Sequence, residues 1–582
     1  MVFLEKCGAI NKTIKIINNL NDRHIKLYIR GVLNVFIMFV RVKKSGSNEY
    51  LQIVQNYREG YKSKQRVIGT LGRVDEVAGS KDIVTLIAKL SKYSNEALMV
   101  ITGQSKIDAR GVSIGPALIF ERLWNEMGMP AIIHEMTGNR KFSFDIERAI
   151  FLTVLHRLFA SGSDRSCDKW KEDYLIEGVH SLALHQLYRA MGFLGEEIED
   201  QKDKTPFSPR CNKDIIEERL FNRRQDLFSG LDLVFFDTTS IYFEGLGGDK
   251  LGYLGHSKDH RPDLNQMVVG AVLDGNGDPI CCELWPRYTS DVKTLLPITD
   301  RIKNRFGVEK FCVVADRGMI SDETLSGLEK RNVSYILGVR MRNVKLVKEE
   351  VISRAGRFEE VIEEGEAMHD PHPLKVKEVI ADGNRYIVCF NERQARKDAI
   401  DRQAIIESLE ERIASNPKSL VGNKGYSKYL KITRGTFKID KKKIEQDRRF
   451  DGKWVLQTST DLPSSEVALK YKELWQVEYA FRDVLTVLET RPIFHKVDET
   501  IRGHVFCSFL ALILRKELDK RLEKQGMDYE WHDIKKDLQA LQEVTLEEQQ
   551  VKLAIRTNCR GICSDLFKAV GVAIPPAIRS LN

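Results

Sequence analysis

The spacing of apolar and polar residues changes several times along the chain, and each change predicts a different kind of element. Residues 38–78 alternate with a period of two on either side of the turns KSGSN and REGYKSKQ, which predicts a small, very basic β-ribbon or hairpin. From 79 to 228 apolar residues recur at helical spacing, as in IGPALIFERLWNEMG and FDIERAIFLTVLHRLFA, which predicts a helical domain. Both regions are candidates for contact with a polyanion, and both are equally consistent with a plain scaffold.

Short apolar runs separated by turns fill residues 229–345. LDLVFFDTTS, NQMVVGAVLD and DPICCELW predict three strands, the last two joined by a D-G-N-G hairpin turn. A helix ending at Gly307, the strand FCVVADRG, the capped helix SDETLSGLEKR and the strand SYILGVR follow. The order β-β-β-α-β-α-β resembles the ribonuclease-H-like fold, an α/β mixed sheet whose first and fourth strands lie side by side.

The remaining segments predict an interrupted core. Residues 346–452 are charged and broken, and we expect a β-rich insertion with strands at YLKITRGTFKI and KKKIEQDRRF. The core resumes over 453–530 with the strand KWVLQTS and one long helix from Ser464 or Ser465, and 531–582 is expected to be a helical tail. Residues 1–37 have a different sequence pattern from the segments that follow, so we interpret them as a non-native extension or flexible arm. Met38 is then a plausible start.

Composition narrows the class of protein. The 582 residues exceed one ordinary core, and 42% hydrophobic and 30% charged residues are typical of a globular chain. The longest early apolar run, 32–40, is too short for a membrane span, and no signal-peptide pattern precedes it, so we expect a cytoplasmic protein without a membrane partner. Ten cysteines lack C-x-x-C spacing, and the net charge of +8 favours a polyanionic partner without requiring one.

Two of the predicted core strands each end in an aspartate, Asp237 and Asp316. Because the predicted order places these strands next to each other, the two carboxylates would repel unless a divalent cation lies between them. Oxygen ligands without a neighbouring Cys or His favour Mg²⁺ or Mn²⁺. Each aspartate taken alone is equally consistent with a turn-forming residue.

Glu478 is the candidate for a third acid. On one continuous helix it would share a face with Tyr471, Leu474, Trp475 and Arg482. An ordinary surface pair of Glu478 with Arg482 is the alternative interpretation, although the aromatic neighbours argue against full exposure. Stacking on a DNA base is a candidate role for Tyr471 and Trp475, but we expect Trp475 to be a core residue.

At these residues the sequence resembles the DDE transposases of bacterial insertion sequences, in the branch with a β-rich insertion before the last glutamate. The matching stretches are FFDTTSIYFEG, GYLGHSKDHRPDLNQMVVGAVLDGNGDPI, ELWPRYTSDVKTL, VVADRGMIS and YKELWQVEYAFRDVLTVLETRPIFH running into IRGHVFCSFLALIL. MFVRVKK and TLGRVDEV also match, so the likeness covers nearly everything from Met38 on. A lone D-T-T-S would be weak evidence, but these blocks in this order are specific.

The resemblance implies that Asp237, Asp316 and Glu478 are the catalytic and metal-binding acids. They would hold two Mg²⁺ ions, with Mn²⁺ as an alternative, for phosphoryl transfer on DNA. Asp237 would bridge both ions, while each of the other acids would complete one. The same site would first hydrolyse the element end and then join the freed 3′-hydroxyl to another strand.

The family's last catalytic helix carries a tyrosine, arginine, glutamate and lysine signature. Tyr471 and Glu478 match it, whereas Leu474 and Leu485 stand at the arginine and lysine positions. This departure removes the phosphate contacts that those two cations would make. Arg482 is the candidate to supply one of them, and a weakened copy of the enzyme is the alternative.

The loop 249–265 follows the first catalytic strand, and its Lys258 and Arg261 are predicted to contact phosphate. His256 and His260 lie in the same loop, but without a Cys or third His nearby they do not predict a zinc site. The resemblance implies double-stranded DNA as partner, both as terminal inverted repeats and as target. It also implies a homodimer on paired ends, located on the bacterial nucleoid.

Two alternatives to an active transposase stay open at this point. One is a ribonuclease-H-like nuclease without strand transfer. The other is a DNA-binding protein whose catalytic centre has decayed, for which Leu474 and Leu485 are the hint. All three interpretations predict DNA binding, so binding alone does not distinguish them.

Overall fold

The computed structural model describes most of the chain, which divides into two compact units. The first unit holds the described part of Met1–Asp108 with Leu546–Lys552 and Ser580–Asn582, and the second holds Ala109–Thr545 with Leu553–Arg579. The predicted arm 1–37 lies outside the described residues. The described residues are 38–59, 62–77, 86, 108–160, 162–201, 208–224, 232–255, 261–361, 373–415, 428–433, 436–484, 490–548 and 551–581.

The first unit contains the antiparallel sheet predicted from the alternating pattern, with three strands rather than one hairpin. These are β1 (Met38–Ser45), β2 (Asn48–Glu59) and β3 (Lys62–Arg73), in that spatial order, followed by the short helix α3 (Val74–Val77). Arg41 of β1 donates hydrogen bonds to Gln52 and Gln65, so one cation is held across all three strands.

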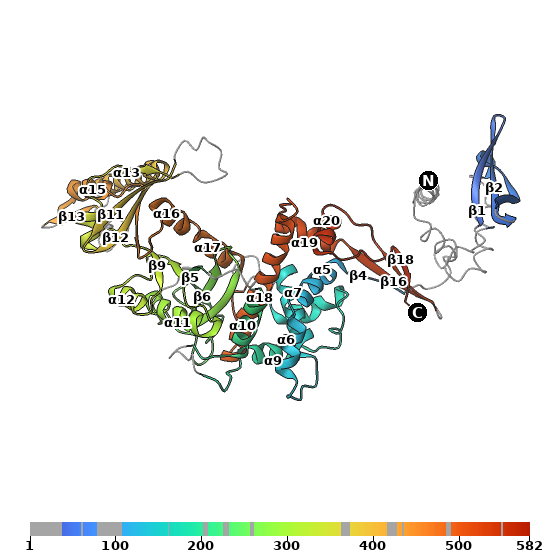
Figure 1. Cartoon of the computed structure of the whole chain (residues 1–582), viewed down its shortest axis with the longest axis horizontal. Coiled ribbons are helices and arrows are strands. Elements are labelled where there is room, and N and C mark those ends of the chain that lie inside the picture. The colour runs from blue at the N-terminus through green and yellow to red at the C-terminus, as the bar shows by residue number, and fades with distance from the viewer. Residues whose placement is uncertain are drawn as a thin grey trace. The chain divides into compact units, whose positions relative to one another are not determined.

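A bundle of helices opens the second unit, as the helical spacing predicted. The N-terminus of α7 is capped by Asp145, whose carboxylate accepts from the backbone of Arg148, and α7 is buried along almost its whole length. The late helix α18 (Asp498–Glu523) packs against α7 and α9 (Figure 1). The bundle therefore joins segments from both sides of the core in sequence: α5 (Gly115–Glu126), α6 (Met129–Thr137), α7 (Ile146–Phe159), α8 (Asp164–Trp170), α9 (Leu184–Gly195) and α10 (Asn212–Arg224).

The core of this unit is a mixed sheet with the predicted ribonuclease-H-like topology. Its first five strands lie in the order β7-β6-β5-β8-β9, with β5 antiparallel to β6 and parallel to β8. The adjacency of the first and fourth strands is thus confirmed. The elements are β5 (Leu233–Tyr242), β6 (Gln266–Asp274), β7 (Pro279–Pro286), α11 (Leu295–Phe306), β8 (Cys312–Ala315), α12 (Asp322–Lys330) and β9 (Ser334–Gly338).

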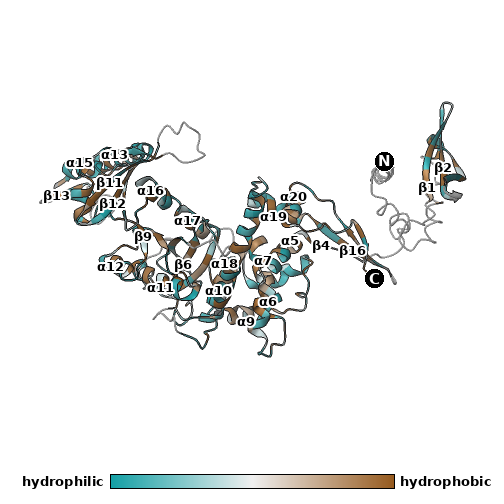
Figure 2. Ribbon diagram, in the orientation of Figure 1, coloured by the Kyte–Doolittle hydropathy of each residue, from teal (hydrophilic) through white to brown (hydrophobic). Residues whose placement is uncertain are grey.

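The insertion continues the same sheet. Its order runs β10-β11-β12-β15-β9, so β15, the strand predicted at KWVLQTS, lies between the insertion and the core. The segment KKKIEQDRRF forms a helix, not the predicted strand, because Asp440 caps it by accepting from the backbone of Lys443. Figure 2 shows α13 and α15 as mainly hydrophilic. The elements are β10 (Glu359–Glu360), β11 (Lys375–Ala381), β12 (Asn384–Phe390), α13 (Glu392–Ser415), β13 (Leu430–Thr433), β14 (Thr436–Ile439), α15 (Lys441–Arg448) and β15 (Lys453–Thr458).

Two further predictions about helices are wrong. The C-terminal tail contains strands as well as helices, because Val551, Leu553 and Ile555 alternate with polar or small residues at the period of a strand. Its strands form a sheet in the order β18-β17-β16-β4. The tail comprises α19 (Trp531–Gln539), β16 (Gln542–Glu548), β17 (Val551–Arg556), α20 (Cys563–Val570) and β18 (Ile578–Ser580), and β4 is Asp108–Ser113.

The long helix predicted after β15 is divided into α16 (Ser464–Lys472) and α17 (Trp475–Arg482). Between them the amide of Leu474 donates to the carbonyl of Tyr471 at 3.1 Å, and the amide of Val477 donates to that of Leu474 at 3.0 Å. These three-residue bonds tighten the turn and change the direction of the side chains that follow. None of the described helices is both long enough and apolar enough to span a membrane.

Different helices cover the two faces of the sheet. Phe235 and Val314 pack in one hydrophobic cluster with residues of α17 and α18. Phe236 and Ala315, the next residue on each strand, pack in a second cluster with residues of α11 and α12. Because side chains alternate along a strand, this division determines which face every other residue of β5 and β8 presents.

Candidate active site

The register of β5 and β8 places Asp237 beside Asp316. The two parallel strands pair Phe236 with Ala315, and Asp237 and Asp316 are the residues that directly follow this pair. By alternation both aspartates lie on the face of Phe235, which α17 and α18 cover. The prediction that the first strand ends at Asp237 is wrong, because β5 continues to Tyr242 through its pairing with β6, and Asp237 is half-buried within it.

Tyr471 from the end of α16 contacts the second aspartate directly. Its hydroxyl donates to Oδ1 of Asp316 at 3.2 Å. Burial and then the negative charge of Asp316 raise the pKa of Tyr471 well above its ordinary value, with a smaller contribution from Asp237. The phenol is therefore a permanent donor that faces both carboxylates. A side chain at Gly338, the last residue of β9, would collide with the Tyr471 hydroxyl, so a glycine is required there.

A further acid, Asp291, lies beside this pair and was not predicted. Its Oδ1 accepts from the hydroxyl of Thr238 at 2.9 Å, while the amide of Thr238 donates to Asp237 at 2.7 Å. A methyl group built on Gly318 would lie 3.5 Å from Oδ2 of Asp291 and 4.0 Å from Oδ2 of Asp316. In the sequence, Asp291 has the position of an ordinary helix-start residue in the stretch RYTSDVKTL, which conceals it.

Glu478 lies on α17, which contacts β5 and β6. Its side chain is exposed, and among the described residues it makes no hydrogen bond or ion pair with Asp237, Asp316 or Arg482. The structure thus brings the two aspartates and Tyr471 together but does not show Glu478 in contact with them. The predicted surface pair with Arg482 is likewise not formed.

The helix that carries Glu478 is held against α18 by its neighbours. Arg515 forms an ion pair with Asp483 at 3.0 Å and donates to the Tyr479 hydroxyl at 3.4 Å. The guanidinium of Arg482 and the ammonium of Lys516 lie 4.8 Å and 5.6 Å from the Tyr479 ring. These contacts set the rotation of α17 and hence the direction of Glu478.

The remaining predicted residues of α17 and its entry turn divide into two groups. Leu474 is 6% exposed and packs in the core, so this position has no side chain available to phosphate. Trp475 is 56% exposed, and the prediction that it is a core residue is wrong because the tight turn before α17 rotates it outward. Leu485 lies outside the described residues.

In the loop after β5, Arg261 forms an ion pair with Asp263 at 3.0 Å and stacks 5.7 Å from the Tyr242 ring. Its contact with phosphate stays a prediction. Lys258, His256 and His260 lie outside the described residues.

The donor set around the aspartates suits hard divalent cations. Asp237 and Asp316 present carboxylates on one face of adjacent strands, and Tyr471 adds a neutral hydroxyl. Carboxylate oxygens in such a pair are the ligands that Mg²⁺ and Mn²⁺ prefer. The pair fits the predicted metal class, and Glu478 on α17, which contacts β5, stays the predicted third acid.

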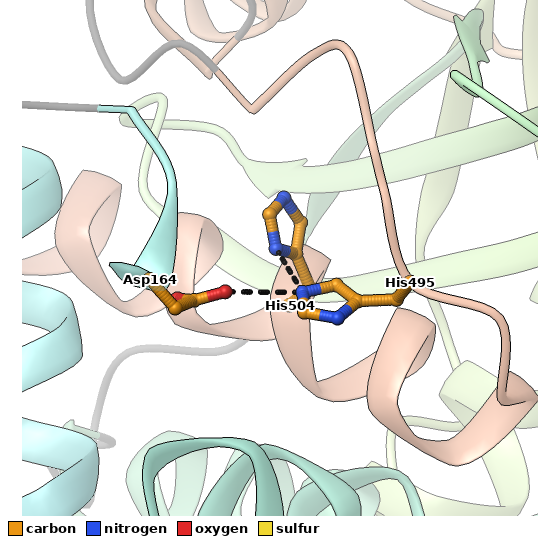
Figure 3. Close-up of side chains that lie close together, drawn as sticks. All are labelled: Asp164, His495 and His504. Carbon is orange, nitrogen blue, oxygen red and sulfur yellow. Dashed lines mark hydrogen bonds and ion pairs between the residues drawn. The ribbon is translucent and has the colours of Figure 1, made fainter. Parts of the chain in front are cut away.

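A second acidic and imidazole group, Asp164, His495 and His504, also has metal-like geometry (Figure 3). Nε2 of His495 lies 3.1 Å from Asp164 and 3.1 Å from Nδ1 of His504, whose Nε2 lies 3.1 Å from the Thr490 carbonyl. Nη2 of Arg157 is 2.9 Å from the same Nδ1 and 3.6 Å from Asp164. Because this guanidinium already supplies the positive charge, we interpret the group as a structural network, not a metal centre.

Two parts of the chain match known protein families. Residues 39–105 match the family model described as IS1634 family transposase, N-terminal domain, and residues 229–514 match the one described as Transposase DDE domain. A similar solved structure is the piggyBac transposase synaptic complex with hairpin DNA, at 10% identity and a TM-score of 0.36, covering 73% of this chain and 79% of that chain. No curated protein sequence matches the chain.

The two family matches, one on the first unit and one on the sheet with its acids, identify the chain as a DDE transposase of insertion sequences. It is therefore an enzyme of DNA transposition.

Proposed function

We propose that this transposase cleaves the ends of its own element and joins them to target DNA, with Asp237, Asp316 and Glu478 as the metal-binding acids. The observation that carries the proposal is the placement of Asp237 and Asp316 one residue beyond a paired position on adjacent parallel strands. Two neighbouring carboxylates on one sheet face repel each other unless cations lie between them.

Each residue near the aspartates has a distinct task in this proposal. Asp237 and Asp316 would hold two Mg²⁺ ions, and Glu478 would complete the set. When bound, the ions would lower the pKa of the attacking water or 3′-hydroxyl and stabilise charge at phosphorus. Tyr471 fixes the rotamer of Asp316 through its hydrogen bond, and Asp291 fixes Thr238 next to Asp237.

DNA contact by Lys258, Arg261, Tyr471 and Arg482 is part of the same proposal. The exposure of Arg482 on α17, one helical turn after Glu478, supports a contact of this side chain with DNA. The basic β1-β2-β3 sheet and a homodimer on paired terminal repeats complete the proposed complex. Backbone contacts of this kind would make binding fall steeply with rising salt.

The test incubates purified protein with Mg²⁺ and linear DNA that carries the element's own ends. Joined products support transposition, cleavage without joining supports a nuclease, and neither product supports a decayed DNA-binding protein. In the same assay Glu478→Gln should abolish cleavage and leave DNA affinity nearly unchanged, because it removes a negative charge without changing shape. An equal loss of affinity would contradict the role given to Glu478.

A further inference from the structure

We propose that α15 of the insertion binds the phosphate backbone of the DNA that reaches Asp237 and Asp316. Four exposed cations of this helix and its C-terminal end would make the contact, and we call them the α15 surface: Lys441, Lys442, Arg448 and Arg449. The inference rests on the proposed function and adds a second DNA contact to it, outside the residues that surround the aspartates.

The inner side of α15 determines which residues face outward. Ile444 packs against the small hydrophobic cluster of α13 and β13, and Asp447 is 9% exposed. The α15 surface lies on the remaining sides of the helix, where all four cations are exposed. Lys442 and Arg449, at positions i and i+7, lie on one line along the helix.

The charge of the α15 surface is not neutralised by acids. Among the residues that the structure describes, none of the four cations forms an ion pair, although Glu445 lies on the exposed part of the same helix. Arg449 donates to the Lys348 carbonyl at 3.3 Å, which orients the guanidinium without neutralising it. Asp440 is occupied as the N-cap.

This concentration of positive charge has a local cost. Residues 441–443 are three lysines in the first turn of α15, where the positive end of the helix dipole disfavours cations. Residues 416–443 contain eight lysines and one arginine against a single acid, Asp440. Several other cations of the insertion are paired with acids instead: Lys375 with Glu392, Arg385 with Glu378, and Arg402 with Asp451. A polyanionic ligand would supply the negative charge that α15 lacks.

A series of contacts connects the α15 surface to the aspartates. Arg340, two residues after β9, donates at 3.1 Å to each of the two carbonyls that directly follow Asp316. Arg342, two residues further, donates to Asp447 on the inner side of α15 at 3.0 Å. Because two residues of chain span at most about 7 Å, α15 lies close to the edge of the sheet where the aspartates are. DNA that reaches Asp316 can therefore continue along Arg340 to the α15 surface.

Asp447 holds this part of the protein together. Besides Arg342 it accepts from Lys428 at 2.7 Å and from the Tyr429 hydroxyl. One buried carboxylate thus joins the loop after β9, the residues before β13 and α15, which fixes the orientation of the helix.

The spacing of the cations suits a polymer of phosphates, not a single small anion. Lys442 and Arg449 are seven residues apart, which is about 10 Å along an α-helix. Phosphates on one DNA strand follow each other at about 3.4 Å along the duplex axis, so the two cations span about three steps.

The experiment measures binding of the full chain to an element-end duplex in Ca²⁺ over a series of salt concentrations. The double variant Lys442→Gln/Arg449→Gln should reduce the slope of log affinity against log salt by about 2, because each lost phosphate contact removes about one. Neutral methylphosphonates are then placed one at a time on both sides of the cut. At one or more positions they should weaken binding by the wild type and leave binding by the double variant unchanged, because both changes remove the same contact. The side of the cut on which these positions lie distinguishes element DNA from flanking DNA.

Two control variants separate the loss of charge from a loss of folding. Lys442→Arg/Arg449→Lys keeps both charges and should bind with the salt slope of the wild type. Lys310→Gln/Lys330→Gln removes two exposed cations that precede β8 and β9, at the opposite edge of the sheet from the aspartates. This variant should keep the salt slope and the methylphosphonate pattern of the wild type. All three double variants should unfold at the wild-type midpoint, since the replaced side chains are exposed.

An unchanged salt slope in Lys442→Gln/Arg449→Gln, or a methylphosphonate pattern identical to that of the wild type, would overturn the inference. Cleavage and joining in Mg²⁺ together with that result would reject the α15 surface and leave the proposed function standing. A reduced slope in a protein that neither cleaves nor joins DNA would support the α15 surface and count against the proposed function.

Discussion

Replacing Tyr471 by phenylalanine tests the contact on which the arrangement of the aspartates depends. The substitution removes one oxygen atom and keeps the ring, which packs against the core. The hydroxyl donates a hydrogen bond to Asp316, so the carboxylate loses a partner that holds its rotamer.

The expected magnitude follows from the geometry. A hydrogen bond to a charged acceptor contributes about 1.5–3 kcal/mol, and a separation of 3.2 Å is long for an O–H donor. We therefore take the lower end, about 1.5 kcal/mol, which corresponds to roughly a tenfold slower cleavage at fixed Mg²⁺. The Mg²⁺ concentration for half-maximal cleavage should rise as well, since Asp316 would be less well oriented.

The assay is single-turnover cleavage of an element-end duplex over a Mg²⁺ titration. Tyr529→Phe is the matched control, because Tyr529 donates to Asp565 at 3.1 Å in the C-terminal segment, and its cleavage rate should not change. Gly338→Ala should slow cleavage at least as much, because its methyl group would displace the Tyr471 hydroxyl. Unchanged rate and Mg²⁺ dependence in Tyr471→Phe would refute the role of this hydrogen bond.

Three other predictions concern the chain around the site. Leu474 is 6% exposed, so Leu474→Arg would bury a charge and should lower the thermal unfolding midpoint without restoring a phosphate contact. Tighter DNA binding at unchanged stability would contradict this prediction. Arg305 forms ion pairs with the buried Glu217 and Glu283, each at 3.1 Å. Arg305→Met leaves these two carboxylates buried without that cation, so it should reduce the free energy of unfolding in urea by about 3–5 kcal/mol. A change below about 1 kcal/mol would show that the cluster of charges rearranges. Burial and the charge of Arg157 lower the pKa of His504 in the folded protein. The free energy of unfolding should therefore be highest above pH ~6.5, the ordinary pKa of histidine, and decline as the pH falls below it. A flat profile between about pH 7 and 5, or the same decline in His504→Gln, would argue against a neutral His504.

The core of the fold is predictable because its signals are local. A D-G-N-G turn predicts the hairpin of β6 and β7. Ser321, which accepts from the Thr324 amide, marks the start of α12, and Gly307, with a φ of 67°, marks the end of α11. The neighbouring placement of β5 and β8 follows from the order of these elements. It brings Asp237 and Asp316 to one edge without any knowledge of distant contacts.

The missed features depend on tertiary contacts. No proline or glycine marks the break between α16 and α17, which is set by the tight turn at Leu474 and the anchoring of Tyr471 on Asp316. The exposure of Trp475 follows from that break. Asp291 becomes a neighbour of the aspartates only once Gly318 and Thr238 are folded beside it.

The position of β15 has a consequence for shortening the enzyme. This strand pairs with β9 on one side and with β12 on the other, and its Val455 and Leu456 are almost completely buried. Excising residues 346–452 would strip β15 of one neighbour and leave a row of unpaired amides and carbonyls beside apolar side chains. Such an edge invites other copies to add on, so a truncated protein would need charged residues or a covering strand there to resist aggregation.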